Sequence, residues 1–165
     1  MITPTVILLI SDPAFKPHAD RIIAELDKYE VFTELRIASA FKTPARLLAV
    51  LEEYESDSSS PHVYITVAGY SDALSGLADT RVTVPVIACP PVELDNARGE
   101  HFPAIEMPTG VAPMLVLGPQ NAALAALKIL SLAVPALAKR VERHLQANVY
   151  RLVSADVELN RDALQ

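Results

Sequence analysis

Runs of consecutive apolar residues alternate along this chain with segments whose apolar residues recur every three or four positions. The runs predict strands buried on both faces, and the periodic segments predict amphipathic helices. Thr43 is expected to cap the helix that Pro44 opens. The predicted strands are Val6–Ile10, Thr33–Ala38, Val63–Val67, Val84–Ala88 and Met114–Leu117. The predicted helices are His18–Tyr29, Pro44–Tyr54, Ser71–Asp79, Asn121–Leu132 and Pro135 to about Val153.

The alternation of strands and helices predicts the fold class. Strand-helix-strand units with right-handed crossovers build a parallel sheet with helices on both faces. We therefore expect an α/β protein of three layers, α/β/α, with a parallel sheet of about five strands and further helices at the C-terminal end. A chain of 165 residues is expected to form one domain, residues 1–165, that buries a full core. The long connection Pro90–Pro108 is expected to be irregular.

Polar and glycine-containing segments follow the first three predicted strands. These segments are Ser11-Asp12, Ser39–Lys42 and Gly69–Asp72. Ligands of open parallel sheets bind outside the carboxyl ends of the strands. We therefore expect the three segments to meet in one crevice.

The composition narrows the possible partners. The formal net charge is −6 and no basic cluster is visible, which argues against a nucleic-acid partner. No apolar run is long enough to span a membrane and no signal peptide is visible, so we expect no membrane partner and a cytoplasmic location.

Cys89 is the single cysteine and is expected to be structural. His18, His62, His101 and His144 lack the spacing of metal ligands, so neither a metal nor a cofactor is expected. Of these, His18 is expected at the surface.

Four segments carry motifs whose order and spacing are informative. They are Arg36–Pro44 with Ser39-Ala40-Phe41-Lys42, Val67–Gly76 with Ala-Gly-Tyr-Ser-Asp, Val84–Pro91 with Ala-Cys-Pro-Pro, and Met107–Gly110. Together they resemble the PurE family, the aminoimidazole ribonucleotide (AIR) carboxylases and carboxyaminoimidazole ribonucleotide mutases of purine biosynthesis. The Ala-Gly-x-Ser and Cys-Pro-Pro forms are similar to the class that uses carbon dioxide directly. The resemblance covers roughly Val6 to Leu132.

The resemblance implies a flavodoxin-like fold that assembles as an octamer, with active sites at subunit boundaries. It also implies that the C-terminal helix and tail, from about residue 135, contact a neighbouring subunit. The apolar residues of Asn121–Ala138 and of the long last helix support an oligomer, and a true PurE-type enzyme is a further candidate partner. The residues expected to line the ligand-binding crevice are Ser11, Asp12, Ser39, Ala40, Phe41, Lys42, Ala68, Gly69, Tyr70, Ser71, Asp72 and Leu74.

The catalytic positions depart from the family pattern. In the family the loop reads Ser-Ala-His-Lys or Ser-Ala-His-Arg and the histidine moves a proton, whereas Phe41 occupies that position here and cannot do so. Lys42 either keeps the basic residue that helps relatives to hold a phosphate, or is an ordinary solvated lysine. Tyr70 stands where the carbon-dioxide-using relatives have arginine, and Asp72 stands where they have asparagine. Together with Asp12, these changes predict a net negative crevice that favours neutral or cationic ligands.

The phosphate loop departs from the pattern as well. The family has Gly-Ser-x-Ser-Asp after the first strand, where the glycine and serines bind the 5′-phosphate and the aspartate binds the ribose. Counting without gaps places Ser11-Asp12-Pro13-Ala14-Phe15 over these positions. A phosphate site needs free N–H groups, but Pro13 has none and Asp12 adds a repelling charge. Either the site is remodelled for an unphosphorylated ligand, or Ser11-Asp12 is only a strand-to-helix turn.

Two hypotheses of function follow. In the one we favour, the protein is PurE-like, related to phosphoribosylaminoimidazole carboxylase, and is catalytically inactive or diverged. It would then keep an oligomeric scaffold that regulates or assembles with a true enzyme. In the other, it is still an enzyme, either an active AIR carboxylase (a lyase) or a new activity in the same crevice. The fold alone does not decide between them, because function resides in the site.

Overall fold

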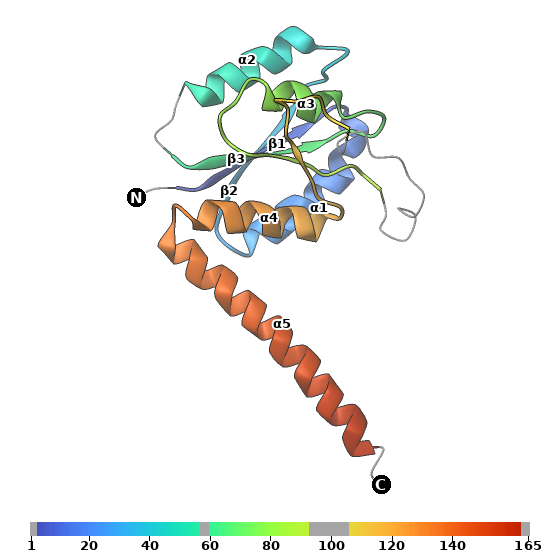
Figure 1. Ribbon diagram of the computed structural model, residues 1–165, viewed down its shortest axis with the longest axis vertical. Helices are drawn as coiled ribbons and strands as arrows, with labels where there is room; N and C mark the ends of the chain where they lie inside the picture. Colours follow the sequence, from blue (N-terminus) through green and yellow to red (C-terminus); the bar gives the residue numbers. More distant parts are fainter. Residues whose placement is uncertain (1–2, 57–59, 93–105, 163–165) are drawn as a thin grey trace.

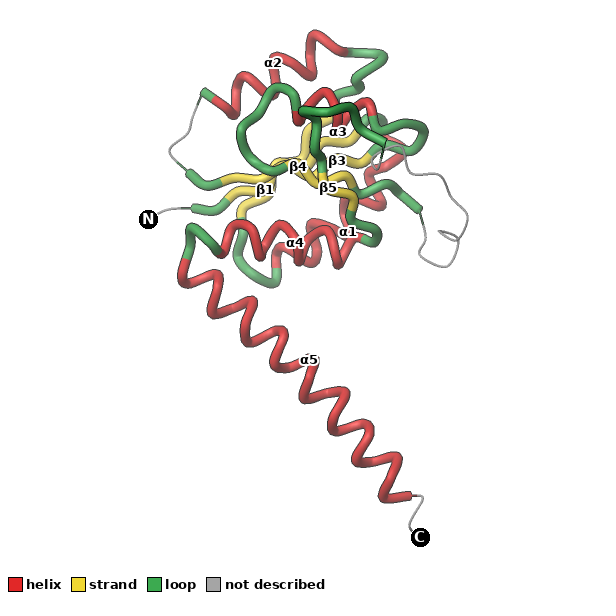
Figure 2. Tube along the Cα trace, in the orientation of Figure 1, coloured by secondary structure: helices red, strands yellow, loops and turns green. Residues whose placement is uncertain are grey.

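The computed structural model describes residues 3–56, 60–92 and 106–162 and has three layers (Figure 1). Helices α2 and α3 cover one face of the sheet, and α1 and α4 cover the other (Figure 2). Residues 93–105 of the connection predicted to be irregular lie outside the described residues.

The strands are β1 (Thr5–Ile10), β2 (Phe32–Ile37), β3 (His62–Val67), β4 (Val86–Ala88) and β5 (Met114–Leu115). The helices are η1 (Pro13–Phe15, a 3-10 turn), α1 (Lys16–Asp27), α2 (Pro44–Glu55), α3 (Ala73–Asp79), α4 (Pro119–Ser131) and α5 (Pro135–Asp162).

The sheet has the strand order β2-β1-β3-β4-β5, and every neighbouring pair is parallel. Leu8 at the middle of β1 is in register with Leu35 of β2 and Ile65 of β3. This arrangement confirms the predicted three-layer α/β class. Because β1 lies between β2 and β3, the loops that leave the carboxyl ends of these three strands are neighbours.

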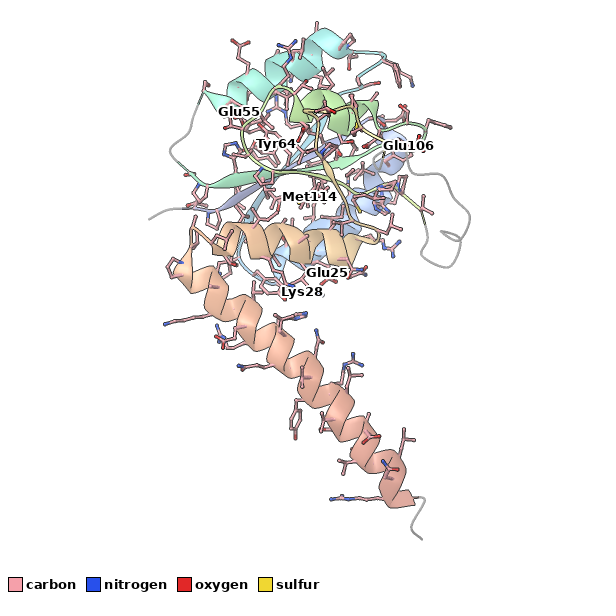
Figure 3. The ribbon with its side chains drawn as sticks, viewed as in Figure 1. Glu25, Lys28, Glu55, Tyr64, Glu106 and Met114 are labelled. Carbon is pink, nitrogen blue, oxygen red and sulfur yellow. The ribbon has the colours of Figure 1, made fainter. Side chains whose placement is uncertain are left out.

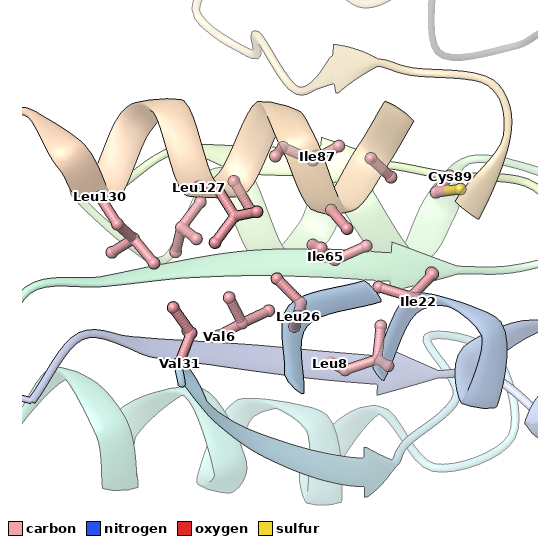
Figure 4. Packing of buried hydrophobic residues seen from close by; sticks show 14 of the residues in the cluster. Val6, Leu8, Ile22, Leu26, Val31, Ile65, Ile87, Cys89, Leu127 and Leu130 are labelled. Carbon is pink, nitrogen blue, oxygen red and sulfur yellow. The ribbon is translucent and has the colours of Figure 1, made fainter. Parts of the chain in front are cut away.

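The side chains of β1 alternate between two cores, which explains why this strand is apolar along its whole length. Val6, Leu8 and Ile10 are buried in the core that α1 and α4 cover, part of which is drawn in Figure 4. Ile7 and Leu9 point to the opposite face and pack beneath α2 and α3. The strand is therefore fixed from both sides, and so is the loop that follows it.

The loop between β2 and α2 is held by Thr43, although not in the way that the sequence predicts. Thr43 occupies the N-cap position, but its hydroxyl makes no hydrogen bond to the first turn of the helix. It accepts a hydrogen bond from the Ser39 N–H at 2.9 Å and donates one to the Ser39 carbonyl at 3.3 Å. The predicted capping role was wrong, and the hydroxyl instead closes the loop that carries Phe41.

Helix α5 is longer than the predicted segment, which ended at about Val153. Its first turns pack on the body of the protein, where Leu137 and Val141 are buried. Beyond these turns the helix extends away from the sheet (Figure 1). In the described part of the chain, no helix combines the length and the apolar character needed to cross a membrane.

The exposed apolar surface lies on α5 rather than on α4. The small and apolar residues of α4, such as Ala122, Ala126 and Leu127, are buried in the chain's own core. They are thus unavailable for an intersubunit contact, whereas Leu132 of the same predicted segment is 88% exposed. Figure 3 shows the side chains of α5 standing clear of the other elements. Its exposed apolar residues are Leu145, Val149, Tyr150, Leu152, Val153, Val157 and Leu159.

Candidate functional site

A cavity of about 320 Å³ lies at the carboxyl ends of β1, β2 and β3, between the loops that follow them. All of the predicted crevice residues except Asp72 line it, and Ala14 and Phe15 line it as well. That these residues bind a ligand stays a prediction. The complete lining is Ser11, Asp12, Ala14, Phe15, Ser39, Ala40, Phe41, Lys42, Ala68, Gly69, Tyr70, Ser71 and Leu74.

Three backbone N–H groups after β1 have hydrogen-bond partners within the protein. The Ser11 N–H donates to the Val67 carbonyl at 3.0 Å, and the Phe15 N–H donates to the Asp12 carbonyl at 3.0 Å. The Ala14 N–H donates to the Asp12 carboxylate at 3.1 Å. Pro13 has no N–H to give. A phosphate cradle requires several such groups pointing into the cavity, so this turn is not built as one.

The two charged residues of the lining neutralise each other. The Lys42 ammonium lies 3.1 Å from the Asp12 carboxylate, which joins the loops after β2 and β1. The hydrogen bond from the Ala14 N–H, together with Lys42, lowers the pKa of Asp12 below its ordinary value. Both side chains reach solvent, so the pair contributes little stability. Its effect is on charge, because the two groups together add no net charge to the lining.

Asp72 lies outside the cavity lining, which overturns the prediction of a net negative crevice. One of its carboxylate oxygens accepts a hydrogen bond from the Ser75 hydroxyl, one turn along α3. The other oxygen is buried and has no hydrogen-bond partner. Burial raises the pKa of Asp72, and the bond from Ser75 only partly opposes this effect. The Asp72 carboxylate is therefore buried against its own helix, α3.

The substitution Asp72→Asn is expected to raise the melting temperature by a few degrees near neutral pH. The folded-state pKa is raised, so ionised Asp72 costs stability above that pKa. The cost disappears as the pH falls below the unfolded-state pKa, where both states carry a protonated carboxyl. Thermal unfolding of the two proteins near neutral pH and at about pH 3 measures the difference. An equal gain at both pH values would show that charge is not the cause.

Phe15 forms one wall of the cavity, and Gly69 allows it to do so. A Cβ atom built on Gly69 would lie 2.6 Å from Cζ of the Phe15 ring, closer than real Cβ contacts. The ring thus rests directly on the backbone after β3. It also packs against the core on the α1 side of the sheet. Phe15 and Ala14 were missed as lining residues, although the gapless count already placed both in the loop.

Phe41 and Tyr70 stand on the two loops that flank the Phe15 wall. The loop of Phe41 is wound tightly around Ser39, whose hydroxyl accepts hydrogen bonds from the N–H groups of Phe41 and Lys42. The Phe41 side chain is 74% exposed and Tyr70 is 97% exposed. Neither ring has been drawn into the protein's own core, so both are available at the mouth of the cavity.

Cys89 and His18 form a buried pair beside the cavity rather than within it. The Cys89 Sγ lies 3.3 Å from Nε2 of His18, and both residues are buried. The prediction of a surface His18 was therefore wrong. Burial raises the pKa of Cys89 to about 12. Reactive cysteines have lowered pKa values and are exposed, so this geometry indicates a structural thiol. No cluster of three or more potential metal ligands occurs among the residues that the structure describes.

Cys89 is expected to react with a disulfide reagent about 10³-fold more slowly in the native protein than an ordinary exposed thiol does. The reason is that the raised pKa removes the thiolate and burial blocks access. The rate of thiol release with Ellman's reagent, measured with and without denaturant, tests this expectation. A native rate close to the denatured rate would show that Cys89 is accessible.

The parallel sheet, its strand order and the cavity at its carboxyl edge define a flavodoxin-like α/β protein. A protein-family model described as "AIR carboxylase" matches residues 5–149. The chain therefore belongs to the AIR carboxylase (PurE) family, the family that its motifs resemble.

Similar proteins cover almost the whole chain. The phosphoribosylaminoimidazole carboxylase of Treponema denticola is 38% identical over 158 residues, which are 96% of this chain and 99% of the relative. The phosphoribosylaminoimidazole carboxylase of Archaeoglobus fulgidus is 37% identical over 153 residues, or 93% of this chain and 83% of the relative. The crystal structure of Treponema denticola PurE superposes with a TM-score of 0.88, covering 94% of this chain and 98% of that one.

Proposed function

We propose that this protein is a PurE-family member that has lost the AIR carboxylase reaction and retains the family scaffold with a remodelled cavity. The observation that carries the proposal is the absence of a histidine among the described residues that line the cavity, whose titratable members are Asp12, Lys42 and Tyr70. Phe41 stands at the position of the family histidine, and Asp12 and Lys42 are bound to each other. A positioned general acid–base group contributes about 10²–10⁴-fold to a rate.

The phosphate side of the cavity supports the same proposal. The turn after β1 directs the N–H groups of Ser11, Ala14 and Phe15 into internal hydrogen bonds. Phe15 occupies the position of the family's ribose-binding acid with an apolar ring. A nucleotide would thus have to lose its hydration without receiving the hydrogen bonds that replace it, which is unfavourable. The remodelled-site reading of this loop therefore has more support than that of a simple turn.

The scaffold function rests on assembly. Helix α5 carries a row of exposed apolar residues, including Val149 and Val153, that the isolated chain leaves in contact with water. Such patches mark contacts with other proteins. We infer that copies of this chain cover it in a homo-oligomer, an octamer by resemblance to the family. A true PurE-type enzyme with the same helix is a second possible occupant, which would make this protein its regulator or assembly partner.

The second candidate function is an active AIR carboxylase. It is favoured by the identities of 38% and 37% to carboxylases over nearly the full chain. Ser39 and Lys42 also keep the family's residues beside Phe41. In this case another group, such as a water or a neighbouring subunit, would have to move the proton.

A spectrophotometric assay of the purified protein with AIR and bicarbonate separates the two candidates. The Treponema denticola carboxylase, assayed in parallel, serves as the positive control. We expect no conversion above background. Turnover by the unmodified protein would establish the second candidate.

A further inference from the structure

Three aromatic residues line the cavity, and each comes from a different loop. Phe15 follows β1, Phe41 follows β2 and Tyr70 follows β3. The whole chain has only four phenylalanines, five tyrosines and no tryptophan. A third of its aromatic side chains therefore gather at one site that the core does not require, since Phe41 and Tyr70 are exposed.

The three rings occupy positions that carry three different polar groups in the family. By the register of the motifs, Phe15 replaces an acid, Phe41 replaces a histidine and Tyr70 replaces an arginine. The side chains at these three places are all aromatic, and together they can form a surface that binds another flat ring.

The exposure of the rings fits such a surface. Phe41 is 74% exposed and Tyr70 97% exposed, so a ligand that lies against them would remove a large apolar area from water. Phe15 is fixed on the backbone of Gly69 and offers a rigid wall. Aromatic pairs prefer offset-stacked and edge-to-face contacts, and three rings from three loops allow both. The volume of about 320 Å³ lies at the lower end of the range for small-molecule sites.

The charges of the lining do not favour an anion, because Lys42 is paired with Asp12 at 3.1 Å. The Ser11 N–H donates to Val67 of β3, and the N–H groups of Ala14 and Phe15 donate to Asp12. These groups are therefore not available to replace the hydration of a phosphate. The hydroxyls of Ser11 and Ser71 also line the cavity, and each can donate or accept a hydrogen bond at the edge of an uncharged ring.

We propose that this cavity binds an uncharged planar heteroaromatic molecule that carries no phosphate, held by stacking against Phe15, Phe41 and Tyr70. The proposal rests on the proposed loss of carboxylation, because it concerns the ligand of the same cavity. It assigns the three loops at the carboxyl edge of the sheet to recognition of a free ring rather than of a nucleotide.

Isothermal titration calorimetry with matched probes tests the proposal. The ring probes are 5-aminoimidazole-4-carboxamide, adenine and benzimidazole. The first two are also tested as their ribonucleoside 5′-monophosphates. We expect at least one ring to bind, and to bind more tightly than its monophosphate. The substitutions Phe41→Ala and Tyr70→Ala should each weaken ring binding roughly tenfold. Both side chains are exposed, so the fold should be retained, as melting curves would verify.

Phe32→Ala provides the control, because Phe32 is a half-exposed phenylalanine on β2 outside this cavity. It should leave ring binding unchanged. Three results overturn the proposal. The first is tighter binding of a monophosphate than of its ring. The second is a loss of binding in the Phe32→Ala control equal to the loss in Phe41→Ala and Tyr70→Ala. The third is failure of all three rings to bind at millimolar concentration.

The carboxylase assay separates this inference from the proposed function. If no ring binds and no turnover occurs, the ligand assignment fails while the loss of carboxylation stands. If AIR is turned over, both fail.

Discussion

Restoring the family histidine alone, by the substitution Phe41→His, will leave the protein without measurable AIR carboxylation. The new imidazole would stand in a cavity whose loop after β1 still has the N–H groups of Ser11, Ala14 and Phe15 bound within the protein and still has the Phe15 ring as a wall. Proton transfer is effective only when the substrate is held within hydrogen-bond reach of the catalytic group. A spectrophotometric assay with AIR and bicarbonate measures the outcome.

The matched variant restores the loop as well as the histidine. It combines Phe41→His and Tyr70→Arg with replacement of residues 11–15 by the family's Gly-Ser-x-Ser-Asp pattern. We expect its turnover to exceed that of Phe41→His by about 10²-fold or more, the scale of one positioned catalytic group. Circular dichroism must verify the fold, because Phe15 packs against the core. Robust turnover by Phe41→His alone would show that the phosphate loop has been misread.

Two aspartates on the apolar face of α5 are expected to dissociate the oligomer. Val149 and Val153 lie one turn apart, are 62% and 56% exposed, and belong to the row that we infer a second copy covers. The double substitution Val149→Asp and Val153→Asp would bury carboxylates in an apolar contact, at a cost that greatly exceeds the loss of two methyl-rich side chains. Light scattering at micromolar concentration should change from the mass of an octamer to that of smaller species.

The control places the same charges on the opposite side of the helix. Ala147 and Ala155 are exposed and lie roughly half a turn away from the valines. The substitutions Ala147→Asp and Ala155→Asp should leave the mass of the oligomer unchanged. A monomer mass for the unmodified protein would refute the assembly, and equal dissociation by both variants would refute the assigned face.

Much of the fold was predictable because the pattern of apolar residues is local. The unbroken run Val6–Ile10 predicted a strand buried on both faces, and its side chains do alternate between two cores. Boundaries were less predictable. Helix α5 continues to Asp162, beyond the predicted end at Val153, since no local signal marks its end. The capping role of Thr43 was wrong because the Ser39 backbone offers its hydroxyl two nearer partners.

The candidate site was predictable in place but not in electrostatics. Parallel strands present their carboxyl ends at one edge, so the segments around Ser11, Ser39 and Gly69 had to meet. The charge of the cavity depended on which partners the carboxylates of Asp12 and Asp72 take. Asp12 pairs with Lys42, which lies on another loop, and Asp72 bonds to Ser75 of its own helix. Each of these choices is decided by about 1 kcal/mol, which no spacing in the sequence reveals.

The sequence by itself determined the family, the layers of the fold and the edge at which the cavity forms. These features follow from local periodicity and from residue identity, which need no knowledge of distant contacts. Only the tertiary structure decided that the N–H groups of Ser11, Ala14 and Phe15 have partners within the protein, that Phe15 lies on Gly69, and that Asp12 pairs with Lys42. Those features arise where loops from different strands compete for the same hydrogen bonds and space, and that competition exists only once the sheet has brought them together.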